Sequence, residues 1–495
     1  FLYVVVAFAT VGAILFGLDQ GNWAGAIEKP DFVEAFCGTS DACKDPERHP
    51  QSYTAFLAWG SSLVQLGAFV GAVLLAPRVT GRAGRREAMF VGCVITAVAV
   101  VPMCLIVQQQ LFMLTRFVAG LGVGIVTYAL PMFISEVSPP AIRGTLGSAF
   151  QLLMVLGMIL AAILNTQPWF GYKLSFSLPF YPAVIMCLGI FCFPVSPRFA
   201  FTRGIRKGEA EKGAEQALRS LERLRGCPKA AAAELAELKK TTESEEEEAP
   251  WSTLWRDPSV RKRVLIANGL QWMQQFTGIN ALLSFGPSML QVAQLDMDPQ
   301  VAQMIINLFN LLGTVTMMVM IDRMGRRPLL LLGSAAMFAF MVAAAVVTVQ
   351  IEVYGNHGGA MGAALMVCLC GYIVSFGIGW GGVCWVYPSE IFPMDVKEKA
   401  MSTSVGSQWL ANFLIAYLVP FQVSGLSLYG TFIFYAVCLA IIFWTIFLFV
   451  PETKGVPMED MDNLFGARLT KLDAQNSDEG SQSSGEDVRS DGATV

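Results

Sequence analysis

Long runs of residues without charged side chains alternate with short charged segments along this chain. Eleven runs lack Asp, Glu, Lys and Arg: 1–18, 53–77, 88–115, 117–135, 144–172, 174–197, 264–295, 299–321, 328–351, 358–389 and 400–450. A helix needs about 20 mostly apolar residues to cross a bilayer core. The first run extends past Asp19 to about Ile27, and the last is long enough for two helices with a turn near Gln422 to Ser427. The pattern therefore predicts twelve membrane-spanning helices, six on each side of a charged middle segment, 198–263.

The composition agrees with a membrane protein. Of the 495 residues, 54% are apolar and only 15% are charged, whereas a soluble globular chain carries about 25% charged residues. These values argue against a soluble enzyme and exclude disordered, collagen-like and disulfide-scaffold classes. The sequence contains no P-loop and no metal-ligand cluster, so we expect no cofactor. No basic patch with interleaved aromatic residues indicates nucleic-acid binding.

The distribution of Lys and Arg predicts the orientation. If residue 1 enters from the cytoplasm, 29 of the 34 basic residues fall in cytoplasmic segments and four in outer loops. Because basic residues favour the cytoplasmic side, we expect both ends of the chain there. We expect no cleavable signal peptide, and we expect the protein to lie in the plasma membrane. Cys37 and Cys43 lie together in a predicted outer lid loop, 28–52. They are candidates for a disulfide, although sequence alone cannot fix the pairing.

Several signatures occur twice, once in each half of the chain. Residues 81–86 follow the second predicted helix as 322–327 follow the eighth. The pair Glu136 and Arg143 matches the pair Glu390 and Lys397, and Pro194 matches Pro451. The equivalent positions are offset by 241, 254 and 257 residues. One six-helix unit is therefore duplicated in the same orientation. Parallel repeats around an axis normal to the membrane are typical of transporters whose substrate site lies between the halves.

The repeated charged residues predict a gate at the inner ends of both halves. The set comprises Arg85, Glu136 and Arg143 in the N-terminal half and Arg326, Glu390 and Lys397 in the C-terminal half. Such pairs could close the inner side and break when it opens. The alternatives are membrane-edge anchors and a merely structural polar network.

Only Asp19 and Arg116 are ionisable residues well inside the predicted spans, where a charge is costly and by default indicates a functional site. Each lies seven or eight residues from the outer end of its helix. At about 1.5 Å per residue, both lie about 10–12 Å below the outer surface, so we expect them to pair. Both histidines, His49 and His357, are predicted in outer loops and cannot carry protons across the middle of the membrane.

Two interpretations of this pair stay open. A static salt bridge would only fix the packing of the helices. Alternatively, burial favours the neutral form of a carboxylic acid, and an adjacent guanidinium favours the ionised form. Movement of the first helix relative to the fourth would then let the acid take up a proton outside and release it inside. The hypothesis is that Asp19 carries the proton and Arg116 tunes it.

Uncharged hydrogen-bonding side chains are concentrated in the predicted spans. They are Gln151, Gln271, Gln274, Gln275, Asn280, Asn307, Asn310, Gln408 and Asn412, with Trp385 and Trp409 nearby in the sequence. Amides both donate and accept hydrogen bonds, and together with aromatic faces they suit a polyhydroxyl ligand such as a sugar. Gly278 could loosen the helix between Gln275 and Asn280 so that both point inward. The alternative, that amides only join helices, is expected for some of them.

Together these residues resemble the sugar porter family of the major facilitator superfamily over about residues 1–460. The marks are Phe16-Gly17-Leu18-Asp19, the two Gly/Arg loops, Pro131 to Glu136 with Arg143-Gly144, Gln151-Leu152 with Gly157, Gln274 to Asn280, Trp385 with Glu390, Gln408-Trp409 and Pro451 to Gly455. The resemblance implies an all-α membrane protein with twelve helices in two parallel six-helix repeats and short cytoplasmic helices between them. It places sugar contacts at Phe16, Gln151, Gln274, Gln275, Asn280, Asn310, Trp385 and Gln408, and adds Arg198 to the inner gate.

The resemblance also bears on coupling. Facilitative animal glucose transporters carry Asn where this chain has Asp19, whereas plant monosaccharide symporters and the bacterial xylose symporter carry Asp. The pair therefore resembles the symporter pattern. Two gate positions depart from the family: Val195 stands where Glu is usual, and Lys397 stands where Arg is usual, which loses bidentate pairing.

These observations predict a secondary transporter that imports a monosaccharide, such as the hexose glucose, with a proton by alternating access. Its expected partners are the sugar, the proton and the bilayer, with a monomer as the functional unit. The expected domains are 1–197, a helical linker 198–263, 264–451, and a tail 452–495 that is disordered beyond about residue 473. Two alternatives are a facilitative uniporter in which Asp19 is structural and a non-transporting sugar sensor, for which 45 residues from 451 onward would be a short tail.

Overall fold

The structure, a computed structural model, describes residues 1–38, 43, 50–139, 142–244, 249–283, 298–355, 359–393, 395–456 and 461–466. Over these residues the chain forms helices and no strand. Ten helical segments are long and apolar enough to cross a membrane. The other two predicted spans correspond to α16 (Pro258–Phe276) and to the part of α22 (Lys397–Phe449) before Ser427. His49 and His357 lie outside the described residues.

The N-terminal half contains the first six spans. Its elements are α1 (Leu2–Ala9), α2 (Val11–Ala26), α3 (Pro30–Phe36), α5 (Gln51–Val70), the π-helical turn η2 (Gly71–Leu75), α6 (Ala76–Arg82), α7 (Arg85–Leu105), α8 (Gln109–Val137), α9 (Arg143–Asn165), α10 (Tyr172–Ser177), α11 (Phe180–Gly189) and η4 (Ile190–Cys192). Three linker helices follow: α12 (Pro197–Arg206), α13 (Ala210–Arg225) and α14 (Pro228–Ser244).

The C-terminal half contains the last six spans. Besides α16 and α22, its elements are α15 (Thr253–Arg256), α18 (Pro299–Met324), α19 (Arg326–Glu352), α20 (Gly359–Phe376), the π-helical turn η5 (Gly377–Gly381), α21 (Val383–Ile391) and α23 (Met461–Phe465). Ser427 has a non-helical backbone (φ 60°, ψ 174°) and divides α22 into two spans. This break lies in the interval where the sequence predicts a turn.

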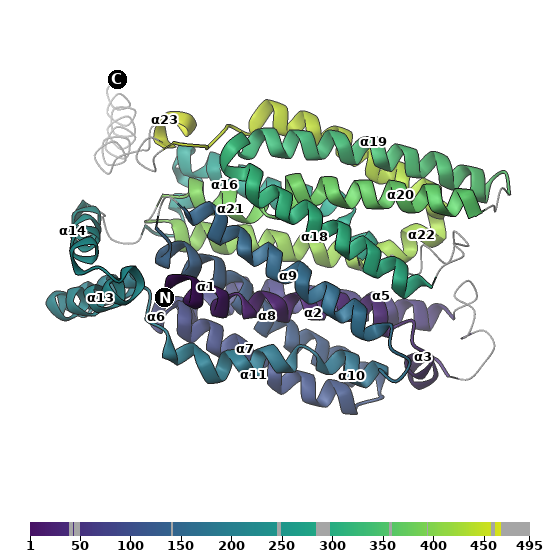
Figure 1. The fold of residues 1–495 in the computed structure, drawn as a ribbon, viewed down its shortest axis with the longest axis horizontal. Helices are drawn as coiled ribbons and strands as arrows, with labels where there is room; N and C mark the ends of the chain where they lie inside the picture. The colour runs from purple at the N-terminus through teal and green to yellow at the C-terminus, as the bar shows by residue number, and fades with distance from the viewer. Residues whose placement is uncertain are drawn as a thin grey trace, which may run out of the picture.

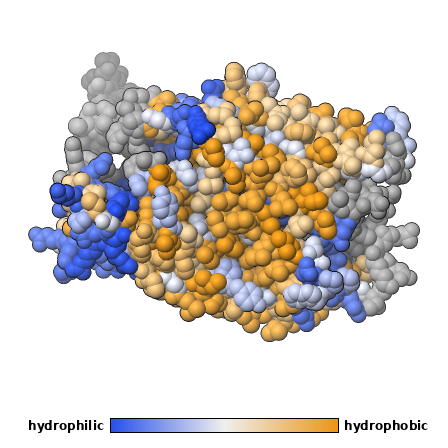
Figure 2. Space-filling view, in the orientation of Figure 1, coloured by the Kyte–Doolittle hydropathy of each residue, from blue (hydrophilic) through white to orange (hydrophobic). Residues whose placement is uncertain are grey.

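The two halves lie side by side with their long helices running in the same general direction (Figure 1). In this view the N-terminal half is the lower layer and the C-terminal half the upper one. Across the interface α5 packs against α22, and α9 packs against α18. The linker helices lie at one end of the bundle, here called the linker end, and α3 lies at the opposite end, the lid end. Apolar side chains cover the surface between the two ends (Figure 2), as a bilayer requires.

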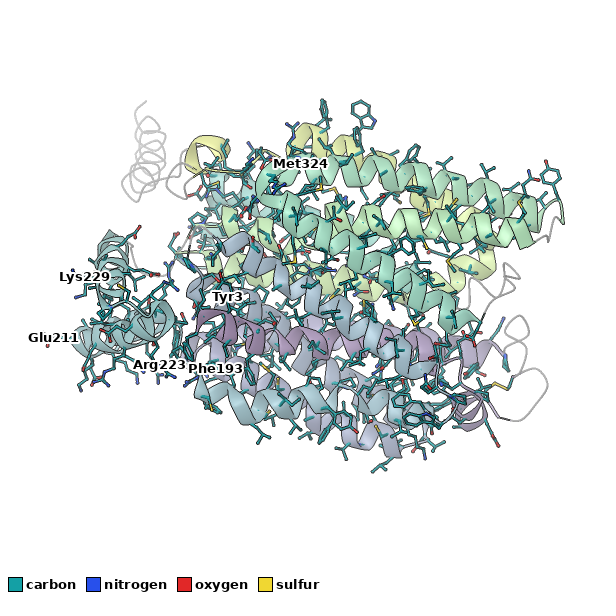
Figure 3. The ribbon with its side chains drawn as sticks, in the orientation of Figure 1. Tyr3, Phe193, Glu211, Arg223, Lys229 and Met324 are labelled. Atoms are coloured by element: carbon teal, nitrogen blue, oxygen red, sulfur yellow. A yellow bond between two sulfur atoms is a disulfide. The ribbon has the colours of Figure 1, made fainter. Side chains whose placement is uncertain are left out.

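The linker helices are docked on the N-terminal half. Arg223 of α13 donates a hydrogen bond to the carbonyl oxygen of Cys192 (3.2 Å), and Arg225 donates to that of Val137 (2.8 Å). Figure 3 shows Glu211 at the far side of α13, pointing away from the bundle. The charged outer faces of these helices therefore contact water rather than lipid.

Glycines let helices within each half approach backbone to backbone. A Cβ atom on Gly17 of α2 would lie 2.0 Å from the carbonyl oxygen of Met154 in α9. In the C-terminal half, a Cβ atom on Gly333 of α19 would lie 2.9 Å from the Cα of Gly379 in η5. Any larger residue at these positions would push the helices apart. The close contacts pack each half as one body.

Candidate functional site

Asp19 and Arg116 form a buried ion pair between α2 and α8. Arg116 Nη1 lies 3.0 Å from Asp19 Oδ1, and the two side chains are 2% and 9% exposed for Arg116 and Asp19 respectively. Arg116 Nε also donates to the carbonyl oxygen of Gly60 in α5 (3.1 Å). The pairing predicted from helix depth is present. The guanidinium joins three helices of the N-terminal half.

Aromatic side chains cover the ion pair toward the lid end. The guanidinium carbon of Arg116 lies 4.8 Å from the ring centroid of Trp23 and 5.7 Å from that of Phe176. These rings belong to a buried cluster that includes Trp23, Phe32, Phe36, Tyr53, Phe56, Phe112, Tyr172 and Phe176. Aromatic faces attract cations, and their bulk excludes water. The cluster therefore holds Arg116 in place and separates the pair from the lid end.

Polar contacts attach α3 to the N-terminal half. Lys29, just before α3, donates from Nζ to the carbonyl oxygen of Asn165 (2.6 Å), and the N–H of Tyr172 donates to a carboxylate oxygen of Asp31 (3.0 Å). Burial lowers the pKa of Lys29, although the carboxylates of Asp31 and Asp298 act in the opposite direction. The short helix is thereby fixed over the aromatic cluster.

A disulfide follows α3. It joins Cys37 to Cys43, which resolves a pairing that the sequence left open. One residue before Cys37, the carbonyl oxygen of Phe36 accepts a hydrogen bond from Gln109 at the start of α8 (2.8 Å). The end of α3 is therefore tied both to its own loop and to the helix that carries Arg116.

A small cavity of about 40 Å³ lies between the two halves. All eight sugar contacts implied by the resemblance line it: Phe16, Gln151, Gln274, Gln275, Asn280, Asn310, Trp385 and Gln408. The lining also includes Gln20, Met154, Met158, Ile279, Leu283, Phe376, Trp409 and Asn412. This volume holds only a few water molecules. A monosaccharide would fit only after the surrounding helices move apart.

The seventh span is interrupted where it reaches the cavity. α16 ends at Phe276, Gly278 has φ +91°, and helical structure resumes over 279–283. Only glycine adopts such a φ readily, and a Cβ atom at Gly278 would lie 2.8 Å from the ring of Tyr435. Both Gln275 and Asn280 line the cavity, and Asn280 donates a hydrogen bond to Gln275. The predicted loosening of this helix is confirmed.

Several amide atoms of the cavity have no hydrogen-bond partner among the described residues. Gln408 Nε2 donates to Gln274 Oε1 (2.6 Å), and Gln274 Nε2 donates to the carbonyl oxygen of Trp380 (2.9 Å). The buried atoms that lack a hydrogen bond within the described part of the chain include Asn310 Nδ2 and Oδ1, Gln275 Nε2, Gln408 Oε1 and Asn412 Oδ1. Because buried polar atoms are nearly always hydrogen-bonded, these donors and acceptors suit the hydroxyl groups of a ligand.

Two of the candidate amides do not line the cavity. Gln271 donates to the carbonyl oxygen of Cys384 (2.9 Å), and Asn307 accepts a hydrogen bond from Gln303 (3.4 Å). Both side chains are buried. The Gln271 contact joins α16 to α21, as expected for some members of the set, whereas the Asn307 contact lies within α18.

Helix α2 connects the ion pair to the cavity. Phe16 lies one turn before Asp19, Gln20 follows it directly, and both line the cavity. The ring of Phe16 meets Trp409 edge to face at 5.0 Å, and Gln20 donates to Asn280 Oδ1 (3.3 Å). Both contacts cross between the halves. Sequence reasoning missed Gln20, although a glutamine beside the intramembrane acid is a visible signal.

Charged side chains from both halves meet at the linker end. Arg85 lies 3.0 Å from Glu136 in its own half and 2.5 Å from Glu398 in the other half. Arg326 lies 2.7 Å from Glu390. Four of these residues are predicted from the sequence, and Glu398 is not, because an acid at the start of a helix has no distinctive spacing.

The structure describes the side chains of two of the three remaining predicted gate residues, Arg198 and Lys397. Arg198 and Lys397 line a cavity of about 1130 Å³ together with Arg85 and Glu136. The side chain of Arg143 lies outside the described residues. The linker end thus combines charge pairs within each half with a contact between halves.

The sequence is similar to known sugar transporters over nearly its whole length. Residues 5–465 match the family described as "Sugar (and other) transporter". Sugar transport protein MST4 of Oryza sativa subsp. japonica is 30% identical over 475 residues, which cover 92% of this chain and 88% of that protein. Sugar transport protein 10 of Arabidopsis thaliana is 26% identical (94% and 91% covered), and low-affinity glucose transporter HXT4 of Saccharomyces cerevisiae is 29% identical (93% and 80% covered).

The fold is also known from solved structures. XylE, a proton:xylose symporter of the major facilitator superfamily bound to 6-bromo-6-deoxy-D-glucose, superposes with a TM-score of 0.76 at 24% identity, covering 94% of this chain and 99% of that one. XylE from E. coli in an inward open conformation gives a TM-score of 0.72 at 23% identity, covering 94% and 100%. These similarities confirm the predicted fold of twelve helices in two parallel repeats. The chain is an integral membrane protein that belongs to the family of sugar (and other) transporters.

Proposed function

We propose that this transporter imports a monosaccharide, a hexose such as glucose, together with a proton by alternating access. One observation carries the proposal. The same helix, α2, contributes Asp19 to the sealed ion pair and Phe16 and Gln20 to the amide-lined cavity. The name of the yeast relative HXT4, a glucose transporter, supports a hexose as the substrate.

In this proposal the proton acts by changing the charge of Asp19. A proton on its carboxylate removes the charge that attracts Arg116, so α2 can shift relative to α8. Arg116 then keeps its hydrogen bond to Gly60 and its contacts with Trp23 and Phe176. Loss of the proton restores the attraction and draws α2 back. Arg116 thus sets when Asp19 takes up and releases the proton.

Movement of α2 reaches the sugar through the cavity. Phe16 contacts Trp409, and Gln20 contacts Asn280, so a shift of α2 alters both contacts between the halves. The binding of the sugar and of the proton then favour the same conformation, which is the condition for coupling.

The cavity favours a neutral, hydroxyl-rich ligand. No charged side chain is among the described residues that line it. The amides of Gln151, Gln274, Gln275, Asn280, Asn310 and Gln408 supply donors and acceptors, and Phe16 and Trp385 supply apolar faces. Asn310 has two buried atoms without a partner in the described residues, which makes it a strong candidate contact.

The linker end acts as the cytoplasmic gate in this proposal. The gate residues are Arg85, Glu136, Arg143, Arg198, Arg326, Glu390 and Lys397. Residues 1–197 and 264–451 form the two rocking bodies, joined by the linker 198–263, and both ends of the chain lie in the cytoplasm. The disulfide at the lid end fits the oxidising exterior of a plasma membrane. One chain contains the ion pair, the cavity and the gate, so the functional unit is a monomer.

Uptake into proteoliposomes tests this function. With the outside more acidic than the inside, the wild-type protein should accumulate radiolabelled glucose against its gradient. Asp19→Asn should lose accumulation and still exchange labelled for unlabelled glucose. Asp298→Asn is the matched control, because Asp298 caps α18 (2.7 Å to the N–H of Gln300) and Asn caps equally well. Fructose, xylose and inositol, tested in parallel, identify the preferred substrate.

The alternatives predict different results in the same assay. A facilitative uniporter would equilibrate glucose without accumulating it, whatever the pH gradient. A sugar sensor would bind glucose without moving it. Accumulation by Asp19→Asn at the wild-type level would contradict the assignment of the proton carrier.

A further inference from the structure

Two buried tyrosines lie against the break in the seventh span. Tyr372 of α20 is 1% exposed, and Tyr435, in the part of α22 after Ser427, is 2% exposed. Neither is among the described residues that line the sugar cavity, so neither is a candidate sugar contact. Any effect of these tyrosines on the sugar must therefore pass through the residues that they contact.

The hydroxyl group of Tyr372 tethers the end of α16. The last carbonyl groups of a helix have no hydrogen-bond partner within that helix. Thr277 directly follows α16, and its carbonyl oxygen accepts a hydrogen bond from Tyr372 Oη (2.8 Å). Thr277 is fully buried, so loss of this donor would leave its carbonyl group unpaired and away from water, which is costly. The bond joins the break to α20.

A second hydrogen bond holds the same end of α16. Gln274 Nε2 donates to the carbonyl oxygen of Trp380 (2.9 Å), which lies in η5 directly after α20. Trp380 Nε1 in turn donates to Ser334 Oγ of α19 (3.0 Å), and α20 packs against both α18 and α19. The segment formed by α20 and η5 therefore holds the end of α16 at two points and is itself braced by its neighbours.

The ring of Tyr435 packs on the next residue of the break. Gly278 has φ +91°, and a Cβ atom there would lie 2.8 to 3.0 Å from three atoms of the Tyr435 ring. The ring thus lies directly against the backbone of Gly278. Its hydroxyl group donates instead to Gln422 Oε1 (3.0 Å). The ring, and not the hydroxyl group, is the part of Tyr435 that contacts the break.

Buried tyrosines commonly serve only to pack helices together and to pair their hydroxyl group. Tyr387 shows that role in the same half of the protein, because its hydroxyl donates to the carbonyl oxygen of Pro451 (3.0 Å). Tyr372 and Tyr435 differ from it. Their contacts converge on two consecutive residues, 277–278, here called the hinge. The hinge separates two of the amides that line the sugar cavity.

We propose that Tyr372 and Tyr435 are positioning residues for the sugar. They hold the hinge in place so that Gln275 and Asn280 face the cavity together. This inference rests on the proposed function for the identity of the ligand. With the hinge held, the sugar meets amides that are already ordered. With the hinge loose, binding must first order them, and the lost freedom reduces affinity.

Exchange of labelled for unlabelled glucose across proteoliposome membranes measures this role. Tyr372→Phe keeps the ring and removes only the hydroxyl group. It should raise the KM about fivefold, as expected for the loss of one buried hydrogen bond, while kcat does not fall. A merely structural role predicts less active protein, with a lower kcat at an unchanged KM, and that result would overturn the proposal.

Tyr387→Phe is the matched control. It removes a hydroxyl–carbonyl hydrogen bond of similar length from a similarly buried tyrosine of the same half. Because Pro451 lies far along the chain from the hinge, the KM should stay at the wild-type value. An increase in KM equal to that of Tyr372→Phe would contradict a specific role for the hinge contact.

Two substitutions separate the ring of Tyr435 from its hydroxyl group. Tyr435→Phe loses the contact with Gln422 but keeps the ring against Gly278, so the KM should not change. Tyr435→Leu removes the flat ring, which frees space over the hinge, and should raise the KM. Equal KM values for the two variants would overturn the assignment to the ring.

Hydrogen exchange without sugar tests the hinge independently of transport. Tyr372→Phe should accelerate amide exchange over 277–283 about fivefold, because this segment opens more easily without its tether. Tyr387→Phe should not accelerate it. The N–H of Leu282, which donates to the carbonyl oxygen of Gly278 (3.2 Å), is a direct reporter.

The two assays distinguish failure of this inference from failure of the proposed function. If the wild-type protein does not exchange glucose, the proposed function is wrong, and hydrogen exchange still decides whether Tyr372 holds the hinge. Unchanged exchange over 277–283 in Tyr372→Phe would overturn the inference, whatever the protein transports.

Discussion

The two halves repeat one fold but secure their linker ends differently. In the C-terminal half, Arg326 donates to both oxygens of Glu390 (2.7 and 3.2 Å), and Glu452 accepts the backbone N–H of Arg326 (3.0 Å). All of these groups belong to that half. In the N-terminal half, Arg85 bonds once to Glu136 and also reaches Glu398 across the interface.

One sequence difference between the repeats lies beside these clusters. Pro194-Val195-Ser196 corresponds to Pro451-Glu452-Thr453 in the repeat. The hydroxyl of Ser196 donates to Glu136, as that of Thr453 donates to Glu390 (3.2 Å). The hydroxyl contact is therefore kept in both halves, whereas the acid is present only in the second. The C-terminal cluster stabilises its own half, and the N-terminal cluster shares its arginine with the other half.

The largest effect is expected from the C-terminal cluster. Arg326→Gln leaves the mostly buried Glu390 without its cation, which should reduce the free energy of unfolding by about 3 kcal/mol. Arg85→Gln should reduce it less, because Arg85 donates one hydrogen bond each to Glu136 and Glu398, whereas Arg326 donates two to Glu390 and a third to the carbonyl oxygen of Ile321 (3.1 Å). Thermal unfolding of both purified variants checks the order. Equal losses would mean that the two clusters play the same part.

The next contrast is between the first and the seventh spans. Asp19 lies on the continuous helix α2, whereas the seventh span is interrupted at Gly278, just after α16. Gly278→Ala imposes a strained φ, which costs about 1–3 kcal/mol, and a clash with Tyr435. We expect glucose affinity to fall about tenfold through displaced Gln275 and Asn280. Gly269→Ala, on the same helix, is the control, since a Cβ atom there would lie 3.8 Å from the methyl of Met273, an ordinary contact distance. Equilibrium glucose binding measures both variants.

The contact between halves should have a moderate effect. Glu398→Gln removes the charge that pairs with Arg85 across the interface. This should destabilise the conformation with the linker end closed by about 1 kcal/mol, which lowers its population relative to the open one about fivefold. Hydrogen exchange over 76–85 should accelerate accordingly. Glu87→Gln is the control, because Glu87 pairs with Arg86 inside the N-terminal half (2.7 Å). Unchanged exchange in Glu398→Gln would show that the contact does not hold the end closed.

The smallest expected effect is a gain in thermal stability. Val195→Glu restores the acid near the N-terminus of α7, where a negative charge is worth about 0.5–1 kcal/mol. The melting temperature should rise slightly, and Val195→Gln, which adds the shape without the charge, should not raise it. A loss of stability in Val195→Glu would mean that the repeat does not place this residue like Glu452.

Much of the fold was predictable because the bilayer imposes strict rules on sequence. Charge-free runs mark the spans, and the cost of an intramembrane charge singles out Asp19 and Arg116. Depth along two helices was enough to predict their contact. The eight proposed sugar contacts came from the family resemblance and line one cavity, while their roles stay predictions.

Other features depend on tertiary contacts that spacing does not reveal. Glu398 is one of several charges near the start of α22, and only the packing of α22 beside α5 and α8 brings it to Arg85. The separation of Gln271 from Gln274 and Gln275 depends on which face of α16 meets α21.

Glycines inside each half and a glycine between the halves have different consequences for the protein. Gly17 against Met154 and Gly333 against Gly379 bring backbone against backbone inside each half. Between the halves, Gly406 of α22 instead faces a methyl group of Val73, which a change of rotamer can move. Mutations along the interface can therefore retune the pace of the transport cycle over evolution, whereas mutations at the internal glycines dismantle the moving parts themselves.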